Sequence, residues 1–256
     1  MRIALLQMDL AWEDVAENHR RARRMLEQAR GEGARLAVLP EMFSTGFSMD
    51  AERVAQPPGG LSETFLRSSS GELGLWIIAS LPESSETRPH NMALVVSPKG
   101  SISRYAKIHP FSYGGEHLHY APGNRVVTVT IDEVRVTPLI CYDLRFPEPF
   151  RAAAAETDLY VVIANWPERR REHWKTLLRA RAIENQAYVA GVNRVGDGDG
   201  LHYAGDSAAI APLGETLAEG DDRERILVSE VDPENVAKLR ARFPALEDRR
   251  PDAYRR

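Results

Sequence analysis

Short runs of branched aliphatic residues alternate along the chain with longer segments that are apolar on one side only. The short runs have the length and composition of buried strands. They predict strands over residues 3–7, 36–39, 76–79, 91–96, 126–131, 134–140, 159–164, 188–193 and 226–231. In the longer segments, apolar residues recur at the spacing of an amphipathic helix. These segments predict helices over residues 15–29, 62–74, 148–155, 171–185 and 233–242.

Two tight turns between neighbouring apolar runs, at residues 99–100 and 132–133, decide which kind of sheet is expected. Such turns join antiparallel strands, whereas helical connections join parallel ones. The chain therefore predicts an α/β fold with mixed sheets covered by helices. It has no internal repeat and no linker-like segment, so residues 1–256 are expected to form one domain. Polar stretches are expected to be surface loops at 84–90, 197–201 and 221–223.

The composition narrows the classes of partner. Apolar residues fill 43% of 256 positions, enough for a large core, yet no stretch approaches the roughly 18 apolar residues of a membrane span. Acidic and basic residues are intermixed and give a net charge of −4, which offers no basic face to a nucleic acid. The chain has one cysteine, and its first apolar run is interrupted at Asp9, too early for a secretory signal. We therefore expect a cytoplasmic protein that binds neither membranes nor nucleic acids.

The single cysteine, Cys141, follows the predicted strand 134–140 and precedes a helix expected to begin near Glu148. Strand ends are where α/β folds place their functional sites, and a thiol at such a turn is a candidate nucleophile. A free cysteine is nonetheless more often an ordinary core residue. Its position alone does not decide between the two.

Two further reactive side chains stand at comparable strand ends. Glu41 directly follows the apolar run 36–39 and Pro40, and a carboxylate partly withdrawn from water can act as a general base. Lys107 follows the run 102–106, and an ammonium there can stabilise a developing oxyanion. Taken singly, each is more often a loop acid or a solvated lysine than a catalytic group.

Other hydrolytic chemistries have weaker support. The sequence contains no Gly-x-Ser-x-Gly elbow, no cysteine pair and no His-Glu-x-x-His signature. His109, His117 and His119 lie close together, but their spacing matches no standard metal-ligand pattern, so no metal is expected. His109 or His117 could still serve as the base of a Cys-His dyad, which is the main mechanistic alternative.

The residues around these three side chains resemble the motifs of the nitrilase superfamily of carbon–nitrogen hydrolases. The order and spacing also fit, because Lys107 lies 107 − 41 = 66 positions after Glu41 and Cys141 lies 141 − 107 = 34 after Lys107. The likeness covers nearly the whole chain and is carried by Leu39-Pro40-Glu41-Met42-Phe43, Tyr105-Ala106-Lys107-Ile108-His109, Ile140-Cys141-Tyr142-Asp143-Leu144-Arg145-Phe146-Pro147, Gly115-Glu116-His117, Asn165-Trp166-Pro167 and Asn193-Arg194-Val195-Gly196.

The resemblance implies a fold and a mechanism. The fold would be a four-layer α-β-β-α sandwich with two mixed sheets, which forms a homodimer through helices near the cysteine strand. Cys141 would attack an amide to give a thioester, with Glu41 as acid and base. Lys107 and the backbone N–H of Tyr142 would hold the oxyanion, and Glu116 would orient Lys107. No metal or organic cofactor is implied.

Within the superfamily the motifs look most like the omega-amidase branch, whose bacterial members hydrolyse 2-oxoglutaramate to 2-oxoglutarate and ammonia. The expected activity is therefore hydrolysis of a linear amide, the omega-amide of 2-oxoglutaramate or of a similar dicarboxylic monoamide such as 2-oxosuccinamate. Such a substrate needs a cation for its carboxylate and apolar walls for its middle. Candidates for the carboxylate are Arg145, Arg194 and Asn165, and candidates for the walls are Phe47, Tyr142 and Trp166.

Several alternatives share this catalytic core. The chain could be an N-carbamoyl amidase, a short aliphatic amidase or a deaminated-glutathione amidase. A nitrile is a less favoured substrate. A transferase would pass the same thioester to an amine, and a non-catalytic scaffold would keep only the fold.

Overall fold

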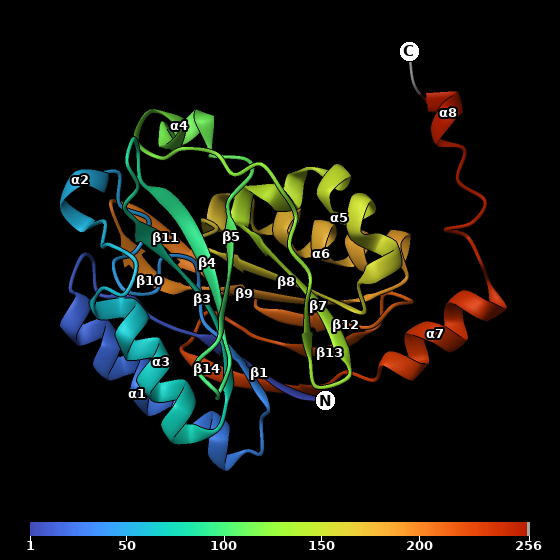
Figure 1. The fold of residues 1–256 in the computed structure, drawn as a ribbon, viewed down its shortest axis with the longest axis horizontal. Coiled ribbons are helices and arrows are strands. Elements are labelled where there is room, and N and C mark those ends of the chain that lie inside the picture. Colours follow the sequence, from blue (N-terminus) through green and yellow to red (C-terminus); the bar gives the residue numbers. More distant parts are fainter. Residues whose placement is uncertain (255–256) are drawn as a thin grey trace.

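The computed structural model describes residues 1–254 and contains two six-stranded sheets packed face to face (Figure 1). The first sheet has the order β14 (Arg225–Glu230), β1 (Arg2–Gln7), β2 (Leu36–Val38), β3 (Trp76–Glu83), β4 (His90–Val96) and β5 (Ile102–Ala106). The second has the order β13 (Thr216–Glu219), β12 (Ala208–Ile210), β9 (Tyr188–Asn193), β8 (Leu159–Ala164), β7 (Val134–Ile140) and β6 (Val129–Ile131). A separate hairpin consists of β10 (Val195–Gly198) and β11 (Leu201–Ala204).

Helices cover the outer face of each sheet. In Figure 1, α1 (Val15–Gly31) and α3 (Leu61–Leu73) lie on one side of the molecule, and α5 (Pro147–Ala153) and α6 (Arg171–Asn185) on the other. Shorter elements occupy the connections and the C-terminal region: α2 (Ala51–Val54), α4 (Glu116–His119), α7 (Pro233–Arg242) and α8 (Pro251–Tyr254), with 3-10 turns at Ser112–Gly114, Cys141–Arg145, Ala154–Glu156 and Glu168–Arg170. The layers are therefore helix, sheet, sheet and helix, and the predicted α/β sandwich with mixed sheets is confirmed.

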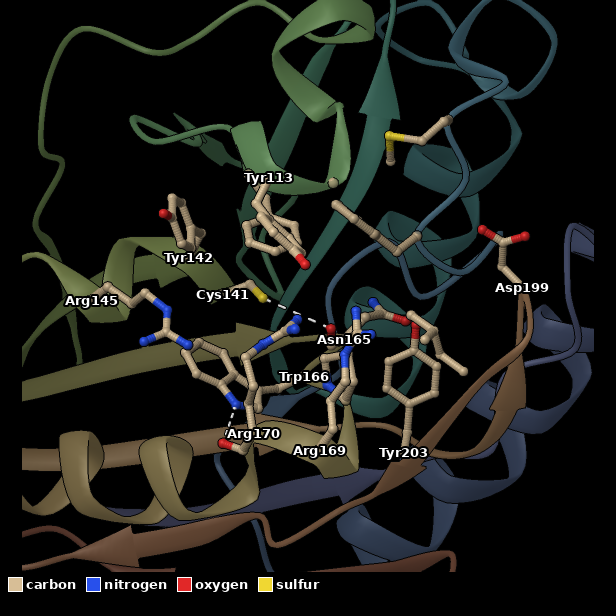
Figure 2. A pocket seen from close by; sticks show the side chains of 16 residues that line it. Tyr113, Cys141, Tyr142, Arg145, Asn165, Trp166, Arg169, Arg170, Asp199 and Tyr203 are labelled. Carbon is tan, nitrogen blue, oxygen red and sulfur yellow. Dashed lines mark hydrogen bonds between the residues drawn. The ribbon is translucent and has the colours of Figure 1, made fainter.

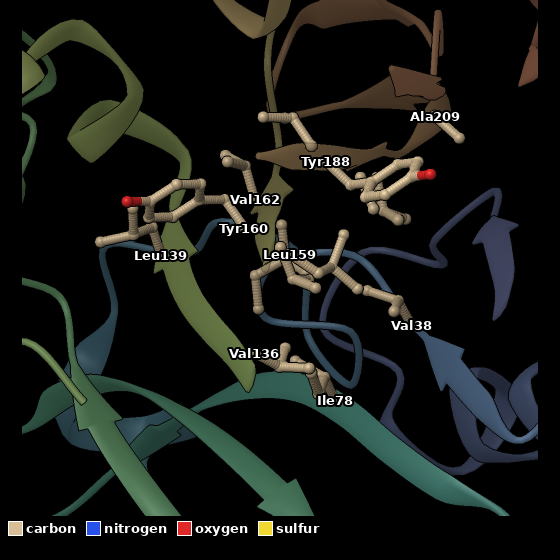
Figure 3. Close-up of a cluster of buried hydrophobic side chains, with 14 of the residues drawn as sticks. Val38, Ile78, Val136, Leu139, Leu159, Tyr160, Val162, Tyr188 and Ala209 are labelled. Atoms are coloured by element: carbon tan, nitrogen blue, oxygen red, sulfur yellow. The ribbon is translucent and has the colours of Figure 1, made fainter. Parts of the chain in front are cut away.

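Burial on both faces explains why the strands are almost continuously apolar. Along β1, Ile3 and Leu5 join the cluster between the two sheets, whereas Ala4 and Leu6 join the cluster beneath α1 and α3. Figure 3 shows the inter-sheet cluster, where Val38 of the first sheet approaches side chains of the second. Each large aliphatic side chain buried in this way stabilises the fold by about 1.5–3 kcal/mol.

The predicted parallel and antiparallel connections are both present. β1, β2 and β3 run parallel, as do β7, β8 and β9. The tight turns at 99–100 and 132–133 join the antiparallel pairs β4–β5 and β6–β7. Because parallel neighbours end at the same edge of a sheet, the residues that follow β2, β7 and β8 are brought to one end of the sandwich.

The structure differs from the sequence prediction at β12 and β13 of the second sheet and at the separate β10–β11 hairpin. Residues 197–201 were expected to be a surface loop, but they form the tip of the β10–β11 hairpin, with Asp199 and Gly200 both at positive φ. β12 and β13 were not predicted either, because small and polar residues there give a weak strand signal. The predicted strand 126–131 begins only at Val129.

No helix among residues 1–254 is both long and apolar enough to cross a membrane. This agrees with the absence of a long apolar stretch in the sequence.

One half-buried histidine makes the stability of the fold depend on pH. His19 of α1 stacks against Phe65 and Phe43, with ring centroids 4.4 and 5.7 Å away, and its Nε2 lies 3.1 Å from the Ser62 hydroxyl oxygen. Burial lowers the pKa of His19 from 6.5 to about 4. The fold therefore favours the neutral ring, and its contribution to stability is present above pH 6.5 and lost as the pH falls toward 4.

We expect urea unfolding to show this loss directly. Between pH 6.5 and 4, the wild type should lose stability more steeply than His19→Gln, with a difference in slope of at most about 1.4 kcal/mol per pH unit. His202→Gln, at an exposed position, is the matched control and should follow the wild type. Parallel pH profiles for the wild type and His19→Gln would contradict the assignment.

Candidate active site

Cys141 stands on a strained turn directly after β7. Its φ of 44° lies in the left-handed region, where a non-glycine residue costs about 1–3 kcal/mol. The turn places Sγ 4.0 Å from the carbonyl oxygen of Asn165, the residue that follows β8 in the same sheet. Cys141 as a residue is half-buried and lines a pocket, so it is not an ordinary core cysteine.

Glu41 reaches the same place from the first sheet. It follows β2, and Met42 after it also has a positive φ, of 45°. The carboxylate is fully buried and accepts three hydrogen bonds: Oε1 from Lys107 Nζ and from Asn91 Nδ2, both at 2.8 Å, and Oε2 from the backbone N–H of Asn165 at 2.8 Å. The Asn165 bond connects the two sheets at the end where Cys141 lies.

Lys107 lies between two carboxylates. It follows β5, is 1% exposed, and its Nζ donates to Glu41 and to Glu116, which is the first residue of α4. The distances to Glu116 Oε1 and Oε2 are 3.1 and 2.8 Å. Nζ also lies 5.1 Å from the ring centroid of Phe47, a pocket residue. The ammonium is thus held by two carboxylates and lies beside the pocket residue Phe47.

The buried charges set the protonation states. Burial by itself lowers the pKa of the Lys107 ammonium, but the charges of Glu116 and Glu41 together outweigh it and raise that pKa above its usual value. Burial also raises the pKa of Glu116, against the opposing effect of Lys107. For the Cys141 thiol, burial and then the charge of Glu41 raise the pKa well above 9, while Lys107 lowers it. Cys141 is therefore a neutral thiol at rest, next to a carboxylate base.

The thiol opens into a pocket of roughly 190 Å³, a size suited to a small molecule. Figure 2 shows its side chains. Five residues expected from the sequence to bind substrate line it: Phe47, Tyr142, Arg145, Asn165 and Trp166. Further lining residues are Met49, Phe111, Tyr113, Gly114, Pro167, Arg169, Arg170, Asp199, Leu201 and Tyr203. The walls are mainly aromatic, and most of the charges are guanidinium groups.

Three arginines of this pocket have no acidic partner. Arg145 packs on the Trp166 ring at 4.8 Å and contacts His173, and Arg170 packs over the Phe111 ring at 5.2 Å. None of the ion pairs found within residues 1–254 joins Arg145, Arg169 or Arg170 to a carboxylate. Burial, reinforced by the charge of Arg169, lowers the pKa of Arg170. An anionic ligand would supply the missing counter-charge.

Arg194, expected from the sequence as a candidate for the substrate carboxylate, is not among the residues that line the pocket. The guanidinium is fully buried behind the pocket wall, where its Nη2 donates to the carbonyl oxygens of Leu10 and Asp197, both at 2.9 Å. It also lies 4.6 Å from the ring centroid of Tyr203, which does line the pocket. Arg194 supports the β10–β11 hairpin, because the chain turns its side chain away from the pocket directly after β9.

The geometry gives no support to a histidine base or a metal. Nδ1 of His109 lies 2.8 Å from Asp143 Oδ1, and the ring stacks on Phe146. His117 and His119 are exposed on α4. Within the described chain, no hydrogen bond joins a histidine to Cys141, and no group of three or more His, Cys, Asp or Glu side chains could hold a metal ion.

Among the residues of the site that sequence reasoning missed, four bear on its charge and hydrogen bonding or on the pocket wall. Asn91 at the start of β4 donates to both Glu41 and Glu116, at 2.8 and 3.2 Å. A buried amide beside two acids has no distinctive sequence spacing. Arg169 and Arg170 belong to a run of charged residues that looks like a solvated turn, and Tyr203 lies on the unpredicted β11. Only their pocket positions reveal them.

Comparisons with known proteins agree with this geometry. A family model described as carbon–nitrogen hydrolase matches residues 2–241. The chain is 41% identical to the omega-amidase YafV of Escherichia coli K12, over 97% of this chain and 96% of that protein. It is 34% identical to the 2-oxoglutaramate amidase of Bacillus subtilis, over 98% of both chains.

Solved structures show the same likeness. A CN-hydrolase superfamily protein from Xanthomonas campestris, with an arsenic adduct in its active site, superposes with a TM-score of 0.93. It is 40% identical, and the match covers 98% of this chain and 97% of that one. An amidase mutant from Nesterenkonia sp. AN1, with acrylamide added to its active-site cysteine, is 26% identical, with a TM-score of 0.83 and coverage of 95% of this chain and 98% of that one.

We expect the resting state of Cys141 to be visible in its alkylation. Because its pKa is raised, the rate of reaction with iodoacetamide should keep rising with pH beyond 9, whereas in urea it should level off near the ordinary value of about 9. The measurement is clean because Cys141 is the only cysteine. A plateau below pH 8 in the folded protein would mean a preformed thiolate instead.

Proposed function

We propose that this chain, which belongs to the carbon–nitrogen hydrolase family, hydrolyses the omega-amide of a short dicarboxylic monoamide such as 2-oxoglutaramate. Family membership establishes an enzyme that cleaves non-peptide carbon–nitrogen bonds. The observation that supports the substrate class is the set of unpaired guanidinium groups in the pocket that contains Cys141.

In the first half of the proposed reaction, the sulfur of Cys141 attacks the amide carbon while Glu41 removes the thiol proton. The raised pKa of Cys141 requires a base at the moment of attack, and Glu41 is the negative charge with the largest effect on that thiol. The oxyanion is stabilised by Lys107 and by the backbone N–H of Tyr142. As the carbon–nitrogen bond breaks, Glu41 returns the proton to nitrogen and ammonia leaves.

In the second half, water attacks the thioester carbon and Glu41 takes a proton from it. The carbon–sulfur bond breaks, Cys141 regains its proton from Glu41, and the carboxylic acid leaves. Glu116 contributes by keeping Lys107 charged and in place, since its two oxygens lie 2.8 and 3.1 Å from Nζ. Glu41, Lys107 and Cys141 each act in both halves of the reaction, and neither half requires a cofactor.

The pocket fits an anion at the end remote from the amide. A carboxylate bonded to one or two guanidinium groups gains about 1.5–3 kcal/mol for each charged hydrogen bond. Arg170 is the strongest candidate, because it is half-buried, packs over Phe111 and has no acidic partner. The relative named 2-oxoglutaramate amidase acts on an amide of this kind, as its name states, and the relative named omega-amidase acts on an omega-amide.

The proposal places the enzyme in the cytoplasm as a homodimer. One free cysteine is compatible with a reducing compartment. Apolar side chains on and beside the outer face of α6 remain exposed, namely Ile183, Leu213 and Leu217. Burial of such a patch against a second copy would remove it from water.

Replacement of the proposed base should separate chemistry from folding. Glu41→Gln keeps the shape of the side chain and removes its ionisable group, so kcat for ammonia release should fall at least about 100-fold. Cys141→Ala should have no measurable turnover, and His117→Ala, at an exposed position, should match the wild type. Near-normal rates in Glu41→Gln together with loss in His109→Ala would instead favour the Cys-His dyad.

The substrate class can be tested with a panel of amides and one arginine variant. The wild type should release ammonia from 2-oxoglutaramate and succinamate faster than from formamide, propionamide, N-carbamoyl acids or short nitriles. Arg170→Gln should raise KM for the dicarboxylic monoamides about 10–100-fold and leave neutral amides unchanged. Arg179→Gln on α6, away from the pocket, is the control. Inactivity of the wild type on every dicarboxylic monoamide would defeat the proposed substrate.

A further inference from the structure

A buried carboxylate that the reaction does not use joins the two halves of the site. Asp143 lies two residues after Cys141 and is fully buried. Its Oδ2 accepts from the Tyr105 hydroxyl at 2.7 Å and from the Ile140 backbone N–H at 3.0 Å. Its Oδ1 accepts from the backbone N–H of His109 at 3.0 Å and pairs with Nδ1 of that ring at 2.8 Å.

The partners of Asp143 flank the reactive residues on both sides. Tyr105 and His109 stand two positions before and two after Lys107, at the end of β5 in the first sheet. Ile140 directly precedes Cys141, at the end of β7 in the second sheet. One carboxylate therefore binds a side chain before the lysine, the backbone after it and the backbone directly before the cysteine, although the lysine and the cysteine belong to different sheets.

Secondary contacts stiffen this connection. The His109 ring stacks on Phe146 with centroids 3.9 Å apart and planes 11° apart, and the Phe146 N–H donates to the Asp143 carbonyl oxygen at 3.0 Å. Burial, together with the charge of Asp143, raises the pKa of Tyr105 well above 10, so the phenol remains a donor. With two hydrogen bonds on each oxygen, Asp143 has little capacity left for proton transfer.

The turn at Cys141 needs such a restraint. A residue held at a φ of 44° stays there only when its surroundings over-determine it. The bond from the Ile140 N–H to Asp143 spans the strained residue itself. Without it, the turn could relax and move Sγ relative to Lys107, and a displacement of about 1 Å can cost about 100-fold in rate.

We propose that Asp143 is a positioning residue that sets where the Lys107 ammonium stands relative to the Cys141 sulfur. The proposal rests on the proposed function, because it assigns Lys107 and Cys141 to the same reaction. Asp143 acts through those two side chains and touches neither the substrate nor the reacting atoms.

The test is Asp143→Asn, which keeps the shape of the side chain. It replaces one carboxylate oxygen by an NH2 group, which is itself a donor and cannot accept hydrogen bonds from the two partners of that oxygen. We expect kcat for 2-oxoglutaramate to fall roughly 100-fold with KM within threefold of the wild type. Because the charge of Lys107 lowers the pKa of the thiol, its displacement should also slow alkylation of Cys141 by iodoacetamide at pH 9 by about threefold, or half a pKa unit.

The matched control is Asp158→Asn. Asp158 is also buried and stands just before β8, at the other end of the sheet. It accepts hydrogen bonds from the side chain and from the backbone N–H of Arg135 on β7. It should lose stability in urea while its kcat and its alkylation rate stay at wild-type values. If both variants lose the same activity at matched stability, or if Asp143→Asn changes KM alone, the positioning role is wrong.

Two further arms keep the test decisive. Should Asp143→Asn fail to fold, Tyr105→Phe removes one of the four donors, and unchanged kcat and alkylation in that variant would overturn the proposal. Should the wild type hydrolyse none of the amides, the proposed function fails by itself. The alkylation rates of Asp143→Asn and Asp158→Asn would then still support or overturn the link between Lys107 and Cys141.

Discussion

The structure of the site depends on one buried cation shared by two buried carboxylates. Lys107 remains charged in the interior because Glu41 and Glu116 both lie within 3 Å of Nζ. Without these acids the ammonium would be a buried charge with no partner, which costs several kcal/mol. The group is completed by Asn91, which donates to both acids and holds their relative positions. These contacts therefore fix the base Glu41, the cation Lys107 and the distance between them.

The two-sheet architecture explains how these residues meet. Glu41, Asn91 and Lys107 come from the first sheet, and Cys141 and Asn165 follow parallel strands of the second. The core between the sheets sets their separation, while the bond from the Asn165 N–H to Glu41 and the contacts of Asp143 adjust it locally. Apolar packing alone is not directional enough for this purpose, whereas buried hydrogen bonds have defined geometry. The polar bridges therefore occur at the one edge where chemistry is expected.

Much of the fold and the centre of the site could be predicted from the sequence. Strands buried on both faces produce unbroken apolar runs, so Glu41 and Cys141 could be assigned to strand ends from the pattern, while the turn at 99–100 indicated the strand before Lys107. The residues that line the pocket were harder to predict, because the sequence does not show which way a side chain points after its strand ends. Arg194 points behind the wall, whereas Arg170 points into the pocket from a charged run that looked like solvent-exposed surface. The β10–β11 hairpin was missed because Gly198, Asp199 and Gly200 resemble a loop, whereas Gly198 pairs with Leu201 and only Asp199 and Gly200 form the turn.

The sharing of one cation by two carboxylates also bears on how a product departs. An amide is uncharged at its reacting end and can enter beside Glu41 and Glu116 without electrostatic penalty. Hydrolysis turns that end into an anion, which then faces the two carboxylates that bind Lys107. The other product, ammonia, becomes a cation once it reaches water. Like-charge repulsion at this end weakens binding of the acid product relative to the amide, so the same side chains that permit cleavage also limit inhibition by the product.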